Sequence, residues 1–323
     1  MADLAFRPFS THLNGQNNLQ EGKDGYNELV EDVYKSIVCM NDDIVVLNKP
    51  AGLSVYGSTS GTASLEKATI IDALPGLSKK MQVLHLDIGV SLKSFYSGLV
   101  VLCKGEEAKK RLEHCLRGSA AQKAQFLSYL VVTVGQPTCS IEKDLTAFIS
   151  RDFIHNREMS LIQEENNNNA RKAGNMMMTS FTVRTLRANE DLGVALVEIS
   201  INRDKWEAVE ALMSHYLSPV LGDSVYSSRT QYVMGVPFRA GAHSVQPGQQ
   251  RLPPSLKQAL QDFQPKWKDH PGSIPLFMHR HKIELRTFPS KASKPLIITA
   301  PPPKHFTSLL KNFGLYAGLT IDR

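Results

Sequence analysis

One stretch of the chain places a carboxylate, basic side chains and aromatic rings between two apolar runs. It reads VLHLDIGVSLKSFYSGLVVLCK and spans Val83 to Lys104. Asp87 ends the first apolar run, Ser97-Gly98 opens the second, and Lys93 lies between them. A carboxylate at the end of a strand can stabilise a developing positive charge, attack as a nucleophile or accept a proton. The alternative is an ordinary acid that caps the strand or forms a surface ion pair.

Other chemistries lack their sequence signatures. The chain contains no G-x-x-x-x-G-K-[ST], no G-x-G-x-x-G and no G-x-S-x-G, which are the patterns of phosphate loops, dinucleotide folds and nucleophile elbows. His279 and His281 share one face of an expected strand, but a metal ion would need more ligands converging there. We therefore expect no metal site.

The composition is that of a globular chain with a basic balance. The 323 residues are 42% hydrophobic and 21% charged, with a formal net charge of +6 and a pI near 9.0. This charge favours an anionic partner, most often RNA or DNA. No apolar run reaches the roughly 18 residues that a membrane span needs. The four cysteines form no C-x-x-C pair, so we expect reduced and mostly buried thiols.

The order of the expected elements indicates a mixed α+β architecture. Residues 1–24 are polar and expected to be loose, residues 25–318 are expected to form one main domain, and residues 150–175 are expected to form an insertion loop around the polar run EENNNNA. Strands are expected at residues 44–47, 81–87, 98–103, 126–134, 179–186, 194–201, 274–285 and 295–299. Residues 25–38 are expected to form a helix or a helix-to-strand transition. Further helices are expected at residues 64–74 (ended by Pro75-Gly76), 106–117, 206–216 and 304–313.

Six short motifs between about Asp42 and Leu315 resemble those of the RsuA/RluA family of RNA pseudouridine synthases, in the family's order. They are NKPAGL from Asn48, SGLVVLCK from Ser97, SYLVVTVGQP from Ser128, PVLGDSVY from Pro219, LFMHRHKIEL from Leu276 and ITAPPPKHF from Ile298. The resemblance implies a pseudouridine synthase fold: a mixed, mainly antiparallel central sheet with flanking helices and a cleft that binds RNA.

The family resemblance also implies a chemistry and a set of site residues. These enzymes isomerise uridine to pseudouridine without a cofactor and are expected to flip the target base into the pocket. Asp87 would be the catalytic carboxylate. Tyr129 matches the family's tyrosine and would stack on the uracil or assist proton removal from C5, the alternative being a tyrosine packed in the core. Lys49 would contact RNA phosphate or shape its loop, and Lys205 would contact RNA.

The catalytic motif fits the family in two registers. Counted back from Ser97 without a gap, the family's aspartate falls on Lys93, whose ammonium is electrostatically wrong beside a developing cation. Aligned from its left end, LHLD supplies Asp87 but needs six extra residues before Ser97. The family's T-G-R-x-H-Q-I-R motif is altered too, because its first arginine becomes Lys205 and its last becomes Glu210.

These departures leave two functional hypotheses. The first is a pseudouridine synthase that acts on mitochondrial mRNA or rRNA and contributes to translation and ribosome biogenesis. The second is an RNA-binding pseudoenzyme that acts as a chaperone or assembly factor. The altered motifs resemble a divergent animal branch of the family, which implies the mitochondrial matrix, a monomer and other mitochondrial RNA-processing proteins as possible partners. The start of the chain carries Asp3 and only Arg7 as a base in its first 20 residues, so as a targeting signal it is weak.

Overall fold

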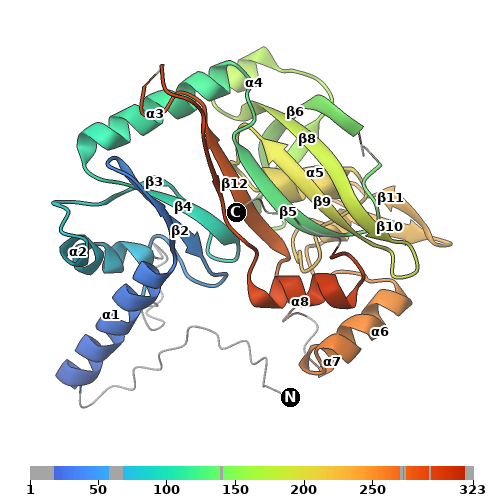
Figure 1. Cartoon of the computed structure of the whole chain (residues 1–323). Coiled ribbons are helices and arrows are strands. Elements are labelled where there is room, and N and C mark those ends of the chain that lie inside the picture. Colours follow the sequence, from blue (N-terminus) through green and yellow to red (C-terminus); the bar gives the residue numbers. More distant parts are fainter. Residues whose placement is uncertain are drawn as a thin grey trace. The chain divides into compact units, whose positions relative to one another are not determined.

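The computed structural model describes residues 18–57, 68–138, 141–269, 272, 274–290 and 292–316 (Figure 1). The chain forms two compact units. The first unit comprises Met1–Gly118 and Arg280–His305, and the second comprises Ser119–His279 and Phe306–Arg323. The bounds 25–318 for one pseudouridine synthase domain stay a prediction.

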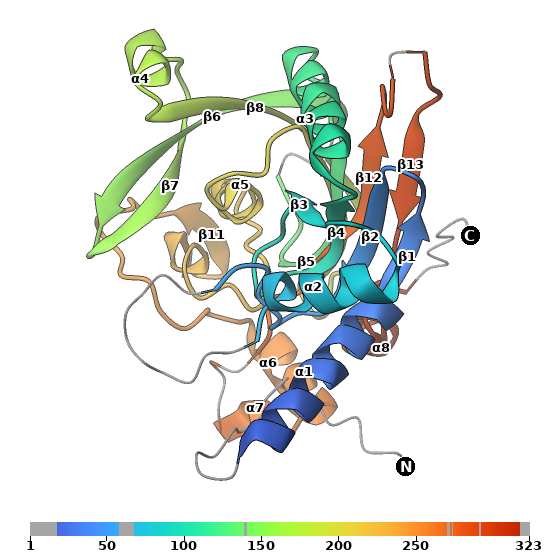
Figure 2. The same cartoon turned by 90° about the vertical axis from the view of Figure 1, so that its left-hand side faces the viewer.

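The first unit is a sheet with helices around it. Its strands lie in the order β1-β2-β4-β12, with β3 paired to β4 and β13 paired to β12. The β1–β2, β2–β4, β3–β4 and β12–β13 pairs are antiparallel. Helices α1 and α2 lie against each other (Figure 2). The elements are α1 (Asn18–Lys35), β1 (Ile37–Met40), β2 (Ile44–Lys49), α2 (Ile70–Lys80), β3 (Asp87–Val90), β4 (Ser97–Cys103), α3 (Glu106–Ala121, entering the second unit), β12 (Met278–Leu285, from Arg280 on) and β13 (Leu296–Thr299).

Two predictions for the first unit are wrong at the element boundaries. Of the helix expected at 64–74, residues 64–67 lie outside the described part. Helix α2 begins after a capping box between Thr69 and Asp72. It continues past Pro75-Gly76 to Lys80, and the buried Leu77 holds its second half in the core. The strand expected at residues 81–87 instead begins at Asp87, and Leu84 is fully exposed. Asp87 therefore opens a strand rather than closing one.

The second unit is built on five antiparallel strands in the order β5-β9-β8-β6-β7 (β5, β9, β8 and β6 in Figure 1, β7 in Figure 2). Apolar residues of β5 and β9 pack with α6, α7 and α8 into its main core. The elements are β5 (Leu127–Val134), β6 (Ile141–Ile154), β7 (Arg157–Gln163), α4 (Asn168–Lys172), β8 (Met176–Asn189), β9 (Val194–Ile201), α5 (Ala208–His215), a 3-10 turn (Ser227–Arg229), β10 (Thr230–Val233), β11 (Val236–Arg239), α6 (Pro254–Phe263), α7 (Lys266–Asp269) and α8 (Lys304–Asn312, of which Phe306 onward belongs to this unit).

Residues 150–175 form paired strands and a short helix rather than the expected loop, and their status as an insertion stays a prediction. Residues 148–154 of β6 pair with 157–163 of β7, and residues 148–150 of β6 also pair with the start of β8. The short helix α4 then occupies the asparagine run. Backbone pairing with neighbouring strands stabilises polar residues that the composition alone assigns to a loop.

Three smaller predictions concern the chain's start, its thiols and membranes. Residues 18–24 belong to α1, so the loose segment predicted for 1–24 is wrong there, and residues 1–17 lie outside the described part. Cys103 and Cys115 are buried free thiols and Cys39 is a half-buried one, while Cys139 lies outside the described part. Among the described helices, none is long and apolar enough to cross a bilayer.

Candidate functional site

A tyrosine and a carboxylate meet at the end of the central strands of the second unit. Tyr129 lies on β5 opposite Ile199 of β9, and its hydroxyl donates a hydrogen bond to Oδ2 of Asp204. Asp204 is half-buried and lies in the short segment between β9 and α5. The two residues are 75 positions apart in the chain, and only the pairing of β5 with β9 brings them together.

Burial decides what Tyr129 can do. The whole residue is 0% exposed, so its ring has no free face on which a base could stack. In this conformation the burial of the Tyr129 ring favours the packed-core alternative, and the stacking and C5 proton-removal roles expected for Tyr129 stay predictions. Its hydroxyl still acts on Asp204, because a hydrogen bond from a buried donor fixes the direction of the carboxylate. Asp204 is the member of the pair that a substrate can reach.

The turn that follows Asp204 has an unusual backbone. Trp206 and Glu207 both adopt left-handed backbone conformations, with φ of 61° and 57°. Lys205, which precedes them, is exposed, as an RNA contact requires, and its assignment to RNA stays a prediction. Non-glycine residues rarely adopt this conformation, and such strain is concentrated at functional sites.

Contacts from the β6–β7 hairpin hold this turn in place. The hydroxyl of Ser160 on β7 donates to the carbonyl of Trp206, and the Arg151 guanidinium lies 4.6 Å from the centre of the Trp206 ring. The Tyr226 hydroxyl donates to Oε2 of Glu207 at 2.7 Å and accepts from the Ser160 N–H at 3.1 Å. The segment expected to be an insertion loop thus supports the site.

Asp87 lies in the first unit in a different setting. It pairs with Cys103, the last residue of β4, whereas Gly98 at the other end of β4 pairs with Lys49. Gly98 and Cys103 are five residue steps apart along the strand, which is roughly 17 Å. The Asp87 carboxylate lies 3.4 Å from Nε2 of His85 and 3.8 Å from Nζ of Lys109 on α3. These contacts match the ion-paired acid that was the alternative for Asp87.

Lys93 occupies the loop that leads directly into Ser97-Gly98. Its ammonium lies 6.0 Å from the centre of the Phe95 ring. The neighbouring Ser94 carbonyl accepts from the Gly52 N–H at 2.7 Å, so this loop joins the turn that follows β2. Lys93 therefore lies in the loop that joins the turn after β2, at the position where the ungapped register predicts the family's acid.

The buried ammonium of Lys49 joins the turn that follows β2 to the loop that contains Lys93. This ammonium contacts the carbonyl oxygens of Pro50 (2.9 Å), Leu53 (2.9 Å), Ser94 (3.1 Å) and Tyr96 (2.6 Å), and the residue is 1% exposed. These contacts favour the alternative role of Lys49, shaping its loop, over a direct phosphate contact, and the RNA role of Lys49 stays a prediction. Burial lowers the pKa of the Lys49 ammonium to about 7, and the charge of Arg280 acts in the same direction.

Replacing Lys49 by methionine is expected to lower the free energy of unfolding by about 3 kcal/mol, because buried carbonyl oxygens lose their shared donor. Chemical denaturation measures this change. Lys205→Met is the matched control, since Lys205 is exposed and its loss is expected to stay within about 0.5 kcal/mol. Equal stability of the two variants would contradict the structural role of Lys49.

A second buried titratable group belongs to the motif GDSVY. Asp223 is 4% exposed; its Oδ1 accepts from the N–H groups of Val225 (2.8 Å) and Tyr226 (3.0 Å), while Oδ2 has no hydrogen bond within the described part of the chain. Burial raises the pKa of the Asp223 carboxyl to about 6, against the opposing effect of the two N–H donors.

The raised pKa of Asp223 predicts a pH dependence of stability. Between about pH 4 and pH 6 the folded carboxyl keeps a proton that the unfolded one has lost, so its contribution, on the order of 2 kcal/mol, is lost as the pH rises through this window. Asp223→Asn keeps the acceptor for Val225 and Tyr226 and removes the titration. We expect a flatter stability profile from pH 4 to pH 6 in urea unfolding of Asp223→Asn, and parallel profiles would contradict the assignment.

Comparison with known proteins identifies the fold first. The chain superimposes on human RNA pseudouridylate synthase domain containing 4 with a TM-score of 0.65 and 18% sequence identity, over 90% of this chain and 98% of that one. The chain therefore has the pseudouridine synthase fold, with mainly antiparallel strands and flanking helices, and the expected fold class is confirmed. The RNA-binding cleft that was expected with it stays a prediction.

Curated sequences then give the particular relatives. The chain is 26% identical over 301 residues to mitochondrial mRNA pseudouridine synthase RPUSD3 of Bos taurus, covering 92% of this chain and 83% of that protein. It is 26% identical over 291 residues to the Homo sapiens protein of the same name, covering 89% of this chain and 78% of that one. No family model matches the chain. The resemblance to RNA pseudouridine synthases that the motifs indicate is confirmed.

Proposed function

We propose that this chain is an RNA pseudouridine synthase whose reacting carboxylate is Asp204. The Tyr129–Asp204 hydrogen bond is the main observation behind this proposal. Through it, the partly solvent-exposed carboxylate of Asp204 contacts Tyr129, the residue that matches the family's tyrosine. The fold and the similarity to curated pseudouridine synthases support the activity.

The isomerisation needs few protein groups besides Tyr129 and Asp204. The C1′–N1 bond of uridine breaks, the uracil turns, and C5 bonds to C1′. N1 gains a proton and C5 loses one, so no atom enters or leaves overall. The carboxylate of Asp204 stabilises the positive charge that develops at C1′ or bonds to it transiently, as carboxylates do in glycosidases. The Tyr129 hydroxyl holds that carboxylate in one orientation, which lowers the reorganisation needed during reaction.

The contacts of the two acids favour Asp204 over Asp87. Asp87 interacts with Lys109 and His85 at the far end of β4 from the Ser97-Gly98 pair. Asp204 accepts from a tyrosine and adjoins the exposed base Lys205, which is suited to an RNA phosphate. Catalysis by Asp87 stays a prediction that the same experiments test.

The proposed substrate is mitochondrial mRNA and the proposed compartment is the mitochondrial matrix. The names of the curated relatives support a mitochondrial messenger substrate. The basic net charge of +6 supports an anionic macromolecule. An rRNA target, a contribution to translation and ribosome biogenesis, action as a monomer and association with other mitochondrial RNA-processing proteins stay predictions.

The test is to map pseudouridine in mitochondrial RNA from cells that carry the wild-type chain, Asp204→Asn or Asp87→Asn. We expect specific sites to disappear with Asp204→Asn and to persist with Asp87→Asn. Full modification with Asp204→Asn would contradict the assignment of the carboxylate. RNA binding without any modification by the wild-type chain would support the pseudoenzyme hypothesis instead, for which the lysine at position 93 is the specific observation.

A further inference from the structure

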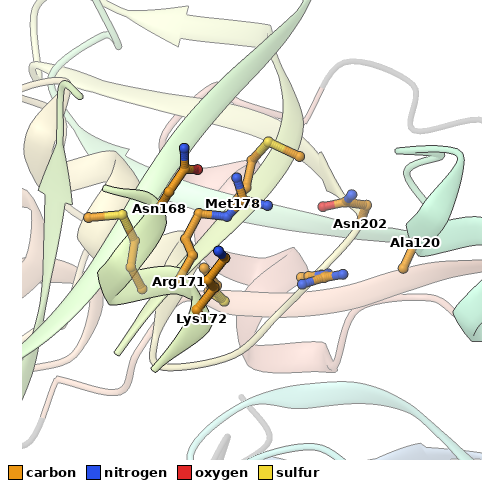
Figure 3. Close-up of a pocket in the computed structure, with 9 residues that line it drawn as sticks. Ala120, Asn168, Arg171, Lys172, Met178 and Asn202 are labelled. Carbon is orange, nitrogen blue, oxygen red and sulfur yellow. The ribbon is translucent and has the colours of Figure 1, made fainter. Parts of the chain in front are cut away.

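The second unit contains a basic pocket of about 320 Å³ that the proposed chemistry does not use (Figure 3). Arg171 and Lys172 of α4 line one side, and Asn202 lies on the other (Figure 3). Arg203, which follows Asn202 in the chain, adds a third cation, and residues 176–178, all methionine, supply apolar surface. None of its described lining residues is acidic.

The asparagine run builds the first wall of this basic pocket. Oδ1 of Asn167 caps α4 by accepting from the N–H groups of Asn169 (3.1 Å) and Ala170 (3.0 Å). Oδ1 of Asn166 accepts from Nη1 of Arg171 at 3.4 Å. The N–H of Asn175 donates to the carbonyl of Ala170 at 2.9 Å, which ties the end of α4 to the start of β8. The polar run thus holds a cationic helix beside the sheet.

Buried hydrogen bonds fix the opposite wall. Asn202 is 1% exposed, and its Oδ1 accepts from the Ser180 N–H at 2.9 Å and from the Thr179 hydroxyl at 3.1 Å. The Thr179 hydroxyl also contacts the carbonyl of Arg203 at 3.3 Å. The backbone of Arg203 is therefore anchored while its side chain stays exposed.

The charges of the basic pocket are available to a ligand. Arg171, Lys172 and Arg203 are exposed, and none of them forms an ion pair within the described ranges. Elsewhere in the same unit, arginines do pair with acids: Arg184 contacts Glu198 and Arg151 contacts Glu158. Three cations around one hollow with an apolar floor match a phosphate that carries a base or sugar.

We propose that this pocket holds a nucleotide of the RNA substrate other than the target uridine. Arg171, Lys172 and Arg203 contact its phosphate, and the methionine surface packs against its base or sugar. Arg203 immediately precedes Asp204 in the chain. An RNA segment bound at Arg203 therefore lies next to the proposed catalytic carboxylate. The identity of the RNA rests on the proposed function, whereas the binding of an anionic nucleotide rests on the pocket itself.

The test compares RNA binding by Arg171→Ala/Lys172→Ala/Arg203→Ala with that of Arg251→Ala/Lys257→Ala/Lys294→Ala. The control also removes three exposed positive charges and leaves the pocket intact. With a single-stranded RNA that contains a modified site, we expect the pocket variant to raise Kd at least about tenfold and to lower the slope of log K against log salt by about 2. The control is expected to stay within about threefold. Equal losses in the two variants would overturn the proposal.

Further measurements distinguish a loss of RNA binding at the pocket from misfolding, from a loss of catalytic activity and from binding of a free nucleotide or phosphate. Arg171→Lys/Arg203→Lys keeps the charges and is expected to restore affinity to within about threefold, which a merely misfolded variant would not show. Saturating RNA is expected to restore kcat in the alanine variant, because Asp204 and Tyr129 are unchanged. If the wild-type chain binds RNA but makes no pseudouridine, the proposed function fails while the binding comparison still decides the pocket. Tight binding of uridine monophosphate or inorganic phosphate with unchanged RNA affinity would overturn the RNA assignment.

Discussion

Replacing Asp204 by asparagine is expected to lower pseudouridine formation by at least about 1,000-fold without loss of the fold. Asparagine has the same shape and can still accept the hydrogen bond from Tyr129, so the β5–β9 end keeps its structure. It carries no charge to stabilise a cation at C1′ and is a poor nucleophile toward it. The measurement is a single-turnover rate on an RNA of known modified site, which separates chemistry from binding.

Asp87→Asn is the matched control for Asp204→Asn. It removes one carboxylate whose contacts are Lys109 and His85, and we expect its rate to stay within about threefold of the wild-type rate. We expect thermal unfolding to show that both variants remain folded. A large loss of rate with Asp87→Asn and little loss with Asp204→Asn would contradict this assignment. It would identify Asp87 as the catalytic carboxylate, as the alignment from LHLD predicts.

Replacing Gly222 by alanine is expected to destabilise the chain by more than about 4 kcal/mol, which would leave it largely unfolded at 37 °C. The backbone of Gly222 has φ of +88°, and an added Cβ would lie 2.1 Å from the carbonyl oxygen of Pro275 and 2.6 Å from its carbon. Backbone atoms cannot move aside as a flexible side chain can. The approach is held by the Phe277 N–H, which donates to the Leu221 carbonyl at 2.9 Å.

Gly248→Ala is the control for Gly222→Ala. An added Cβ at Gly248 meets no atom within 4 Å, and its backbone is outside the left-handed region. We expect this change to stay within about 0.5 kcal/mol of wild type in urea unfolding. Similar stabilities for the two variants would show that the segment before β12 does not pack on the G-D motif as described.

Local sequence patterns predicted the parts of the fold that depend on burial. Residues 44–47 are predicted to form a strand because they are an aliphatic, β-branched run, and this segment and the strand predicted at 194–201 both form buried strands. The β6–β7 hairpin is not predicted from the sequence. It is stabilised by the pairing of β6 with β8, and the polar local sequence gives no indication of this pairing. The helix predicted at 64–74 extends past Pro75 because its capping box and the burial of Leu77 stabilise it despite the proline.

The candidate site was predicted only in part, and the reason is distance along the chain. Tyr129 was found through a motif, but its partner Asp204 is 75 residues away in a segment that no longer matches the family's pattern. The altered motif singles out Lys205 and Glu210 by comparison with the family's arginines, and it gives no signal for Asp204. Lys49 was found for its type, but only the four carbonyls around it distinguish a buried ammonium that joins loops from one that binds phosphate.

Release of tritium from RNA that carries uridine labelled at C5 tests the central claim most directly, because the C5 proton leaves only when pseudouridine forms. With purified wild-type chain, we predict release in a fixed ratio to the pseudouridine found by mass spectrometry, and none above background with Asp204→Asn. Wild-type chain that binds the same RNA but releases no tritium from it or from mitochondrial mRNA would contradict the account.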